Sequence, residues 1–192
     1  MGKIVLTEFV TVDGVMEDPG GAEGTERGGW VFSFDRGPEG DKFKLDELMD
    51  ADAMLLGRKT YAGFAQAWPS RTDEEGFAER MNGMRKYVVS STLSDEDASW
   101  NNTVVLRGDP AEEVRALRAQ PGGNILIAGS GQLARALIRQ TLIDEYRLMV
   151  FPVVLGPGQR LFSDSGALSR LSLDECSTCG DGILMLVYHP LR

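Results

Sequence analysis

Apolar and polar residues alternate along the chain in two rhythms, one typical of strands and one typical of helices. Short apolar runs bounded by glycine, proline or acidic residues predict strands at 3–10, 53–56, 86–90, 103–106, 124–128, 146–155, 171–178 and 183–189. Apolar residues at i, i+3 and i+4 spacing predict helices at 41–51, 59–67, 74–81, from Pro110 to the break at 121–123, and from Gly131 to about 140.

The order of these elements indicates an α/β protein. Strands and helices take turns until about residue 143, and only strands follow. The last two strands flank Gly180-Asp181-Gly182, which predicts an antiparallel hairpin. We therefore expect a mixed sheet with a mostly parallel centre, covered by helices, and a single domain over residues 1–192.

One long segment, residues 17–40, lacks either rhythm and is rich in glycine, proline and acidic residues. Trp30, Phe32 and Phe34 interrupt it, and a long loop with aromatic residues is more often a substrate lid than a linker. Trp30 and Phe32, with Trp68 at the end of an expected helix, are candidates to stack on a flat substrate. Packing in the core is the commoner role for such large side chains.

Charge and hydropathy exclude several classes of partner. The formal net charge is −9 and no lysine–arginine cluster occurs, which argues against nucleic acid but not against a small phosphorylated ligand. No apolar run reaches about 18 residues and no secretory signal begins the chain. We expect a soluble, cytoplasmic protein without membrane contact.

The usual nucleophile and metal motifs do not form. Cys176 and Cys179 lack a second ligand pair and His189 is the only histidine, so neither a tetrahedral zinc site nor a Ser–His–Asp hydrolase is expected. The chain also lacks the GxxxxGK[ST] phosphate loop. We expect no metal.

Two turns that join a strand to a helix carry the strongest binding signal. They are centred on Gly57 and Gly129. At such a turn the unpaired amides and the helix dipole favour an anion, and the missing Cβ lets a phosphate approach. Arg58 and Lys59 add cations, and Thr60 adds a hydroxyl. Either glycine alone is equally consistent with a tight turn that binds nothing.

The second turn also fits a dinucleotide fingerprint through Gly129, Gly131 and Ala134. A Rossmann domain would carry an acidic residue about 20 positions later, at the end of the next strand, and residues 148–152 contain none. We therefore expect a phosphate-binding turn outside a Rossmann fold.

A third candidate is the hydroxyl triplet Ser90-Ser91-Thr92 at the end of a predicted strand. Hydroxyls at the carboxyl end of a strand can bind a ribose or its phosphate. Capping of a turn is the alternative, and the triplet alone slightly favours it.

Taken in order, these segments resemble the dihydrofolate reductase superfamily, most closely the branch related to the C-terminal reductase domain of the riboflavin-biosynthesis deaminase-reductase. The segments that carry the resemblance are 11–16, 56–61, 90–93, 127–133, 152–158 and 160–162. The resemblance implies a three-layer α/β/α fold with a mixed, mostly parallel central sheet and a C-terminal antiparallel hairpin. It also implies NADPH as cofactor and, with the hairpin, a homodimer.

The resemblance also assigns roles to single residues. Val15 and Met16 would lie beside the nicotinamide ring, and the serines of the triplet would contact the adenosine ribose and its 2′-phosphate. The expected cofactor-binding residues are Val15, Met16, Gly57, Arg58, Lys59, Thr60, Ser90, Ser91, Thr92, Gly129, Ser130, Gly131, Gln132 and Leu133. Gln132 stands where folate enzymes often have a basic residue, which leaves the choice between NADPH and NADH open.

The expected reaction is hydride transfer from NADPH to a C=N or C=O carbon of a small, planar heterocycle. Asp13, Glu17 and Asp41 are the acids best placed by sequence to supply the accompanying proton. By its distance from Gly57, Asp41 matches the carboxylate of dihydrofolate reductases, but its position also suits a helix N-cap, which we favour.

Two other functions remain open. The first is a reductase of riboflavin biosynthesis acting on a phosphorylated ribosyl-amino-pyrimidine, for which Arg27, Arg36 and Lys42 would supply cations. The absence of a fused deaminase domain argues against it. The second is a nucleotide-binding protein without turnover, which would bind NADPH but would give no NADPH oxidation above background with any compound of a substrate panel.

Overall fold

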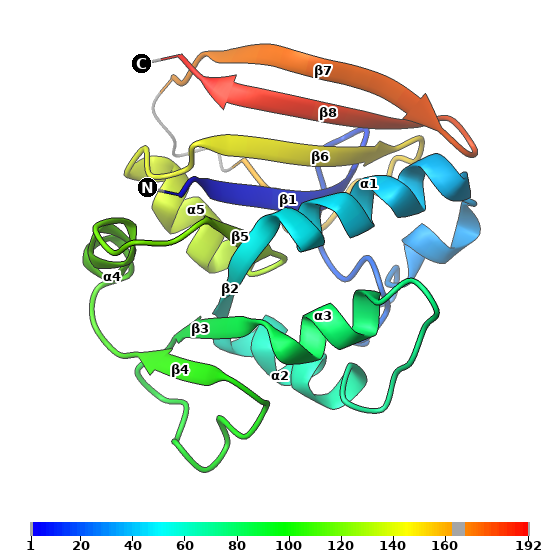
Figure 1. The fold of residues 1–192 in the computed structure, drawn as a ribbon. Coiled ribbons are helices and arrows are strands. Elements are labelled where there is room, and N and C mark those ends of the chain that lie inside the picture. Colours follow the sequence, from blue (N-terminus) through cyan, green and yellow to red (C-terminus); the bar gives the residue numbers. More distant parts are fainter. Residues whose placement is uncertain (1, 163–167, 192) are drawn as a thin grey trace.

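The computed structural model describes residues 2–162 and 168–191, and in this part of the chain an eight-stranded sheet lies between helices (Figure 1). The strands are β1 (Ile4–Thr11), β2 (Ala51–Gly57), β3 (Arg85–Val89), β4 (Thr103–Leu106), β5 (Asn124–Ala128), β6 (Glu145–Phe151), β7 (Leu171–Cys179) and β8 (Ile183–Pro190). The helices are α1 (Gly37–Asp50), α2 (Arg58–Ala67), α3 (Phe77–Gly83), α4 (Pro110–Arg118), α5 (Gly131–Arg139) and the short 3-10 helix η1 (Trp30–Ser33).

The strand order across the sheet is β4-β3-β2-β5-β1-β6-β8-β7. Strands β4 to β6 in this order pair in parallel, whereas β8 pairs antiparallel with both β6 and β7. Helices α1, α2 and α3 pack on one face through Leu48, Tyr61 and Met81, and α4 and α5 pack on the other through Val114 and Leu137. The expected three-layer fold with its C-terminal hairpin is confirmed.

The first helix begins earlier than its periodicity indicates. Pro38 occupies the first turn of α1, a position that proline favours because it has no amide to pair there. Asp41 is therefore inside the helix, and the prediction that it is the N-cap is wrong: Arg36 takes that position and pairs with Asp41 at 2.7 Å. By contrast, the predicted cap at Asp109 is confirmed, since its carboxylate accepts the amide hydrogens of Ala111 and Glu112.

Strand β6 ends at Phe151, four residues before the expected boundary at 155. Pro152 follows, and proline has no amide hydrogen with which to continue a ladder. In the described part of the chain, no helix is both long and apolar enough to cross a membrane.

A buried lysine gives the core an unusual dependence on pH. Lys86 is fully buried on β3, and its Nζ donates to the carbonyl oxygens of Asn82 (2.6 Å) and Asn101 (3.0 Å) above the Trp100 ring. Burial lowers the pKa of Lys86 to about 8 from its ordinary value of 10.5. Between these values the unfolded chain binds more protons than the folded one, so this residue makes stability rise with pH.

We expect the free energy of unfolding of wild type, minus that of Lys86→Met, to increase between about pH 7 and about pH 10. Urea unfolding at the two pH values measures it. Lys42→Met, which removes an exposed lysine, is the control. The difference in free energy of unfolding between wild type and Lys42→Met should not change with pH over this range. A flat difference for Lys86→Met as well would show that the folded protein does not shift this ammonium.

Candidate active site

The connections after β2 and β5 leave the same edge of the sheet in opposite directions. These two strands are parallel neighbours, yet α2 packs on one face and α5 on the other (Figure 1). In open α/β sheets, ligands bind in the crevice beyond the carboxyl ends of the strands at such a point. The candidate site is therefore the edge where β3, β2, β5 and β1 end.

The two predicted glycine turns meet at this edge. The Gly57 amide donates to Ser130 Oγ, and the Ser130 amide donates to Thr60 Oγ1, each at 2.9 Å. Gly129 and Ser130 both adopt left-handed backbone, with φ of 58° and 59°. A Cβ on Gly129 would lie 3.1 Å from Thr60 Cγ2, so the turns approach as closely as glycine allows.

Both helix N-termini keep the capacity to bind an anion. The N-cap residues are Gly57 for α2 and Ser130 for α5, and neither helix has a capping hydrogen bond from a side chain. Amides of the first turn therefore stay available. Arg58 and Lys59 are exposed, and neither forms an ion pair with the described residues. The amides of Gly57 and Ser130 are themselves used to join the turns. The remaining donors and the two cations fit the phosphates of a dinucleotide.

The hydroxyl triplet splits into two parts. Ser90 is buried, and its Oγ accepts the amide hydrogens of Thr92 (3.2 Å) and Leu93 (3.0 Å), which is the turn-capping alternative. Ser91 and Thr92 are exposed at the end of β3, next to β2. A ribose or phosphate contact from this strand therefore falls to Ser91 and Thr92.

Asp13 joins two loops at the end of β1. Its carboxylate accepts hydrogen bonds from Thr11 Oγ1 (2.6 Å) and from the amides of Leu155 (3.2 Å) and Gly156 (2.8 Å). The Thr11 hydroxyl, followed by these amides, lowers the pKa of Asp13 to about 2. Asp13 is thus held as a carboxylate, which is unfavourable for donating a proton.

The residues that follow Asp13 lie against the second glycine turn. Val15 and Met16 are buried, and the Met16 sulfur lies 3.1 Å from the point where Gly131 would carry a Cβ. Leu133, in the first turn of α5, has its side chain buried in the core rather than exposed at the site.

The three aromatic candidates for substrate binding do not come together. Trp30 is buried against Phe151, with ring centroids 5.3 Å apart. Phe32 is 79% exposed. Trp68 packs on Phe77 at the far end of α2, about 15 Å along the helix from Gly57. A shared stacking pocket made by Trp30, Phe32 and Trp68 has no geometric support.

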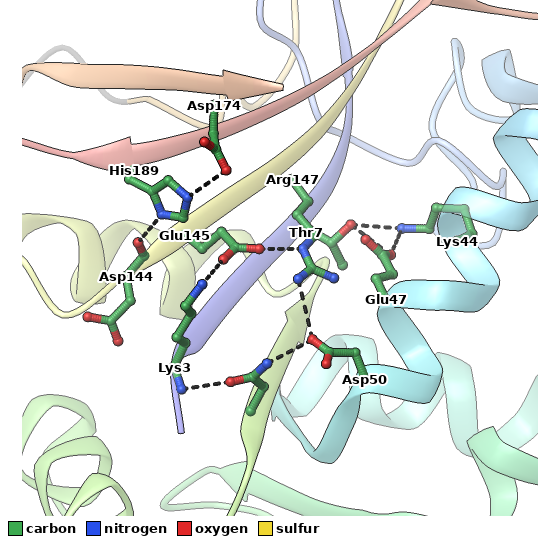
Figure 2. A network of polar contacts seen from close by, with 11 residues as sticks. Lys3, Thr7, Lys44, Glu47, Asp50, Asp144, Glu145, Arg147, Asp174 and His189 are labelled. Carbon is green, nitrogen blue, oxygen red and sulfur yellow. Dashed lines mark hydrogen bonds and ion pairs between the residues drawn. The ribbon is translucent and has the colours of Figure 1, made fainter. Parts of the chain in front are cut away.

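Two buried acids escaped the reasoning from sequence. Glu8 on β1 and Glu47 on α1 are 5% and 3% exposed, and each has one carboxyl oxygen without a partner among the described residues. Glu47 pairs with Lys44 and accepts the Thr7 hydroxyl at 2.9 Å, as Figure 2 shows. Burial raises the pKa of Glu8 well above its ordinary value. The available signal was an acid inside an apolar run.

A second polar network lies at the opposite end of β1 and β6 (Figure 2). Glu145 pairs with Lys3 (2.7 Å) and Arg147 (2.6 Å), and Arg147 reaches Asp50 of α1. His189 contacts Asp174 on the hairpin. These contacts join α1 to β6 and the two hairpin strands to each other, and they contribute nothing to the carboxyl edge.

In the described part of the chain, the two cysteines form no disulfide and no metal-binding cluster occurs. Cys176 and Cys179 both lie on β7 as free thiols, the first exposed and the second buried. Within residues 2–162 and 168–191, no three histidine, cysteine or acidic residues are arranged to hold a metal ion.

Comparison with known proteins agrees with the fold. The sequence profile of the family described as the RibD C-terminal domain matches residues 2–185. The protein named YyaP from Bacillus subtilis is 31% identical over 190 residues, which are 97% of this chain and 94% of YyaP. A putative riboflavin biosynthesis protein from Shewanella sp. PV-4 superposes with a TM-score of 0.78 at 19% identity and 99% coverage of both chains. A pyrimidine reductase-like protein from Corynebacterium diphtheriae gives 0.69 at 16% identity, covering 100% of this chain and 92% of that one.

Proposed function

The chain belongs to the RibD C-terminal domain family, and this membership indicates a reductase. We propose that the protein uses NADPH to reduce a small heterocycle at a C=N or C=O carbon. The observation that carries the proposal is the pair of glycine turns joined through Gly57, Thr60 and Ser130 where the sheet changes direction.

The cofactor would extend along the carboxyl edge of the sheet. First-turn amides of α2 and α5, with Arg58 and Lys59, would hold its phosphates. Ser91 at the end of β3 would contact the adenosine ribose, and Met16 after β1 would pack on the nicotinamide. Three strand intervals, about 14 Å, separate β3 from β1. When bound, NADPH supplies the hydride, and the protein orients it and excludes water.

The contacts of Arg27, Arg36 and Lys42 favour a substrate without a phosphate group. Arg27 bonds to the Leu155 carbonyl, Arg36 pairs with Asp41, and Lys42 pairs with Asp46. A ribose phosphate would compete with each of these contacts, so we place the phosphorylated ribosyl-amino-pyrimidine second. The name of the Corynebacterium relative, a pyrimidine reductase-like protein, supports pyrimidines as the first compounds to assay.

NADPH is expected to raise the melting temperature of the protein, and Arg58→Gln/Lys59→Gln is expected to weaken NADPH binding by about tenfold or more. Hydrogen bonds to charged groups contribute about 1.5–3 kcal/mol each, and tenfold corresponds to 1.4 kcal/mol. Dye-based thermal shift and fluorescence titration measure the two effects. Arg71→Gln is the control, because Arg71 covers Trp68 at the far end of α2.

Several results would contradict the proposal. If neither NADPH nor NADH stabilises the protein, the cofactor assignment is wrong. If NADPH binds but is not oxidised above background with any pyrimidine or pteridine compound, the nucleotide-binding function without turnover replaces the reductase. By contrast, a larger rise in melting temperature with NADPH than with NADH would support the proposal, because it would show that the 2′-phosphate is recognised.

A further inference from the structure

Glu8 lies where the nicotinamide end of the proposed site meets the sheet. Strand β5 pairs with β1 only as far as Ala128 opposite Thr7, so Glu8 is the first residue of β1 beyond that pairing. The backbone amide of Gly129 is close enough to the Glu8 carboxyl to favour its charged form. Since side chains alternate along a strand, Glu8 points to the α5 face, beneath the turn that begins α5.

The environment of Glu8 favours the neutral form of its carboxyl group. Burial is the largest influence and raises its pKa well above the ordinary value, and Glu47 on α1 acts in the same direction. Lys44 on α1, Arg135 on α5 and the Gly129 amide favour the charged form but do not outweigh burial. One oxygen, Oε1, is buried and has no partner among the described residues. An unpaired polar atom of this kind is costly and is retained where it has a use.

The other acids of the site are less suited to supply a proton. Asp13 is held as a carboxylate by three hydrogen bonds, and Asp41 is largely exposed and paired with Arg36. Glu47 forms an ion pair with Lys44 on the α1 side of β1. Glu8 is buried, and its pKa is raised well above the ordinary value, which favours the neutral acid.

The charge of the nicotinamide ring depends on its redox state, neutral when reduced and positive when oxidised. A buried carboxyl next to the ring must respond, because an opposite charge in a medium of low dielectric stabilises the ionised acid. We propose that Glu8 couples a proton to this change: it is the acid beside the reduced cofactor and the carboxylate beside the oxidised one.

This role rests on the proposed function and completes its balance. The hydride, with both bonding electrons, forms the new C–H bond, and the π electrons of the C=N or C=O bond move to the heteroatom. The Glu8 O–H bond breaks and its proton goes to that heteroatom. Glu8 remains as a carboxylate paired with the positive ring, and it regains a proton from water when the oxidised cofactor leaves.

Binding of the two cofactor forms tests this without a known substrate. Isothermal titration in two buffers of different ionisation enthalpy counts the protons released on binding. We expect NADP⁺ to release about one more proton per site than NADPH does. In the pH range where this extra proton is released, the affinity for NADP⁺ should rise by up to about tenfold per pH unit, and the affinity for NADPH should stay nearly constant.

Two matched variants locate the proton. Glu8→Gln keeps the size and polarity of the side chain and should abolish the difference in proton release between the two nucleotides. It should also remove a protonated-carboxyl band from the infrared spectrum, and in wild type that band should weaken when NADP⁺ binds. Glu47→Gln removes the other acid with an unpartnered oxygen and should leave the difference intact.

The possible failures are distinguishable. If wild type binds neither nucleotide, the proposed function falls and the role of Glu8 falls with it. If NADP⁺ binds wild type without extra proton release, or if Glu8→Gln retains that release, only the role of Glu8 is wrong. Folding of the variant is checked by its stability, which should exceed that of wild type increasingly as pH rises above 4.5, because the native acid holds a proton that the unfolded chain loses.

Discussion

Replacing Phe151 with alanine is expected to lower the free energy of unfolding by about 3–5 kcal/mol, the typical cost of deleting a buried phenylalanine ring. Phe151 has no exposed surface, and three rings meet it edge-on: Trp30 at 5.3 Å, Phe9 at 5.4 Å and Phe34 at 5.7 Å. Each such aromatic pair contributes stability beyond that of the area it buries. Urea unfolding of wild type and variant measures the loss.

Two further variants separate packing from composition. Phe151→Leu keeps most of the volume and should lose clearly less stability than the alanine variant. Phe32→Ala, two residues after Trp30 in η1, removes a ring that is 79% exposed and should change stability by no more than about 0.5 kcal/mol. A loss below 1 kcal/mol for Phe151→Ala would mean that the cluster does not hold segment 30–34 on β6.

The arrangement of elements along the chain was predictable because its signals are local. Residues 103–106 and 124–128 match β4 and β5 at both ends, since polar or glycine residues bound each apolar run. The start of α1 was not predictable, because Gly37 and Pro38 are as common in loops as in a first helical turn. The order of strands was beyond local reasoning, because it depends on contacts between distant segments.

The same distinction applies to the site. Each glycine turn could be found in the sequence, because only a few structural roles, such as a tight turn or a close approach of the backbone, favour glycine between a strand and a helix. The bonds that join the turns through Ser130 and Thr60 span about 70 residues and leave no local trace. Trp30 was a candidate to stack on a substrate, with core packing as the commoner alternative, and the structure buries its ring against Phe151 of β6.

Glu8 shows why a buried acid escapes a pattern of hydrophobicity. A strand of a parallel sheet is covered on both faces, so its sequence is a nearly continuous apolar run. An acid in such a run looks like a break in the core and gives no sign of its depth. Only the end of β5 opposite Thr7 shows that Glu8 borders the second glycine turn.

Gly129→Ala is expected to weaken NADPH binding by about tenfold or more while the fold is kept. Gly129 has φ of 58°, a region that costs a residue with a Cβ roughly 1–2 kcal/mol. The new Cβ would also lie 3.1 Å from Thr60 Cγ2 and 3.2 Å from its hydroxyl. Relief of either strain moves the α5 amides away from the phosphates. Fluorescence titration with NADPH measures the affinity.

The contribution of crowding can be separated from that of backbone strain. Thr60→Ser removes Cγ2 but keeps the hydroxyl that accepts the Ser130 amide, so Gly129→Ala/Thr60→Ser should regain part of the affinity. Gly63→Ala, in the middle of α2 with open space around its Cβ position, should leave binding unchanged and raise stability slightly. If Gly129→Ala binds NADPH as wild type does, the second turn does not hold the cofactor and the proposed site is wrong.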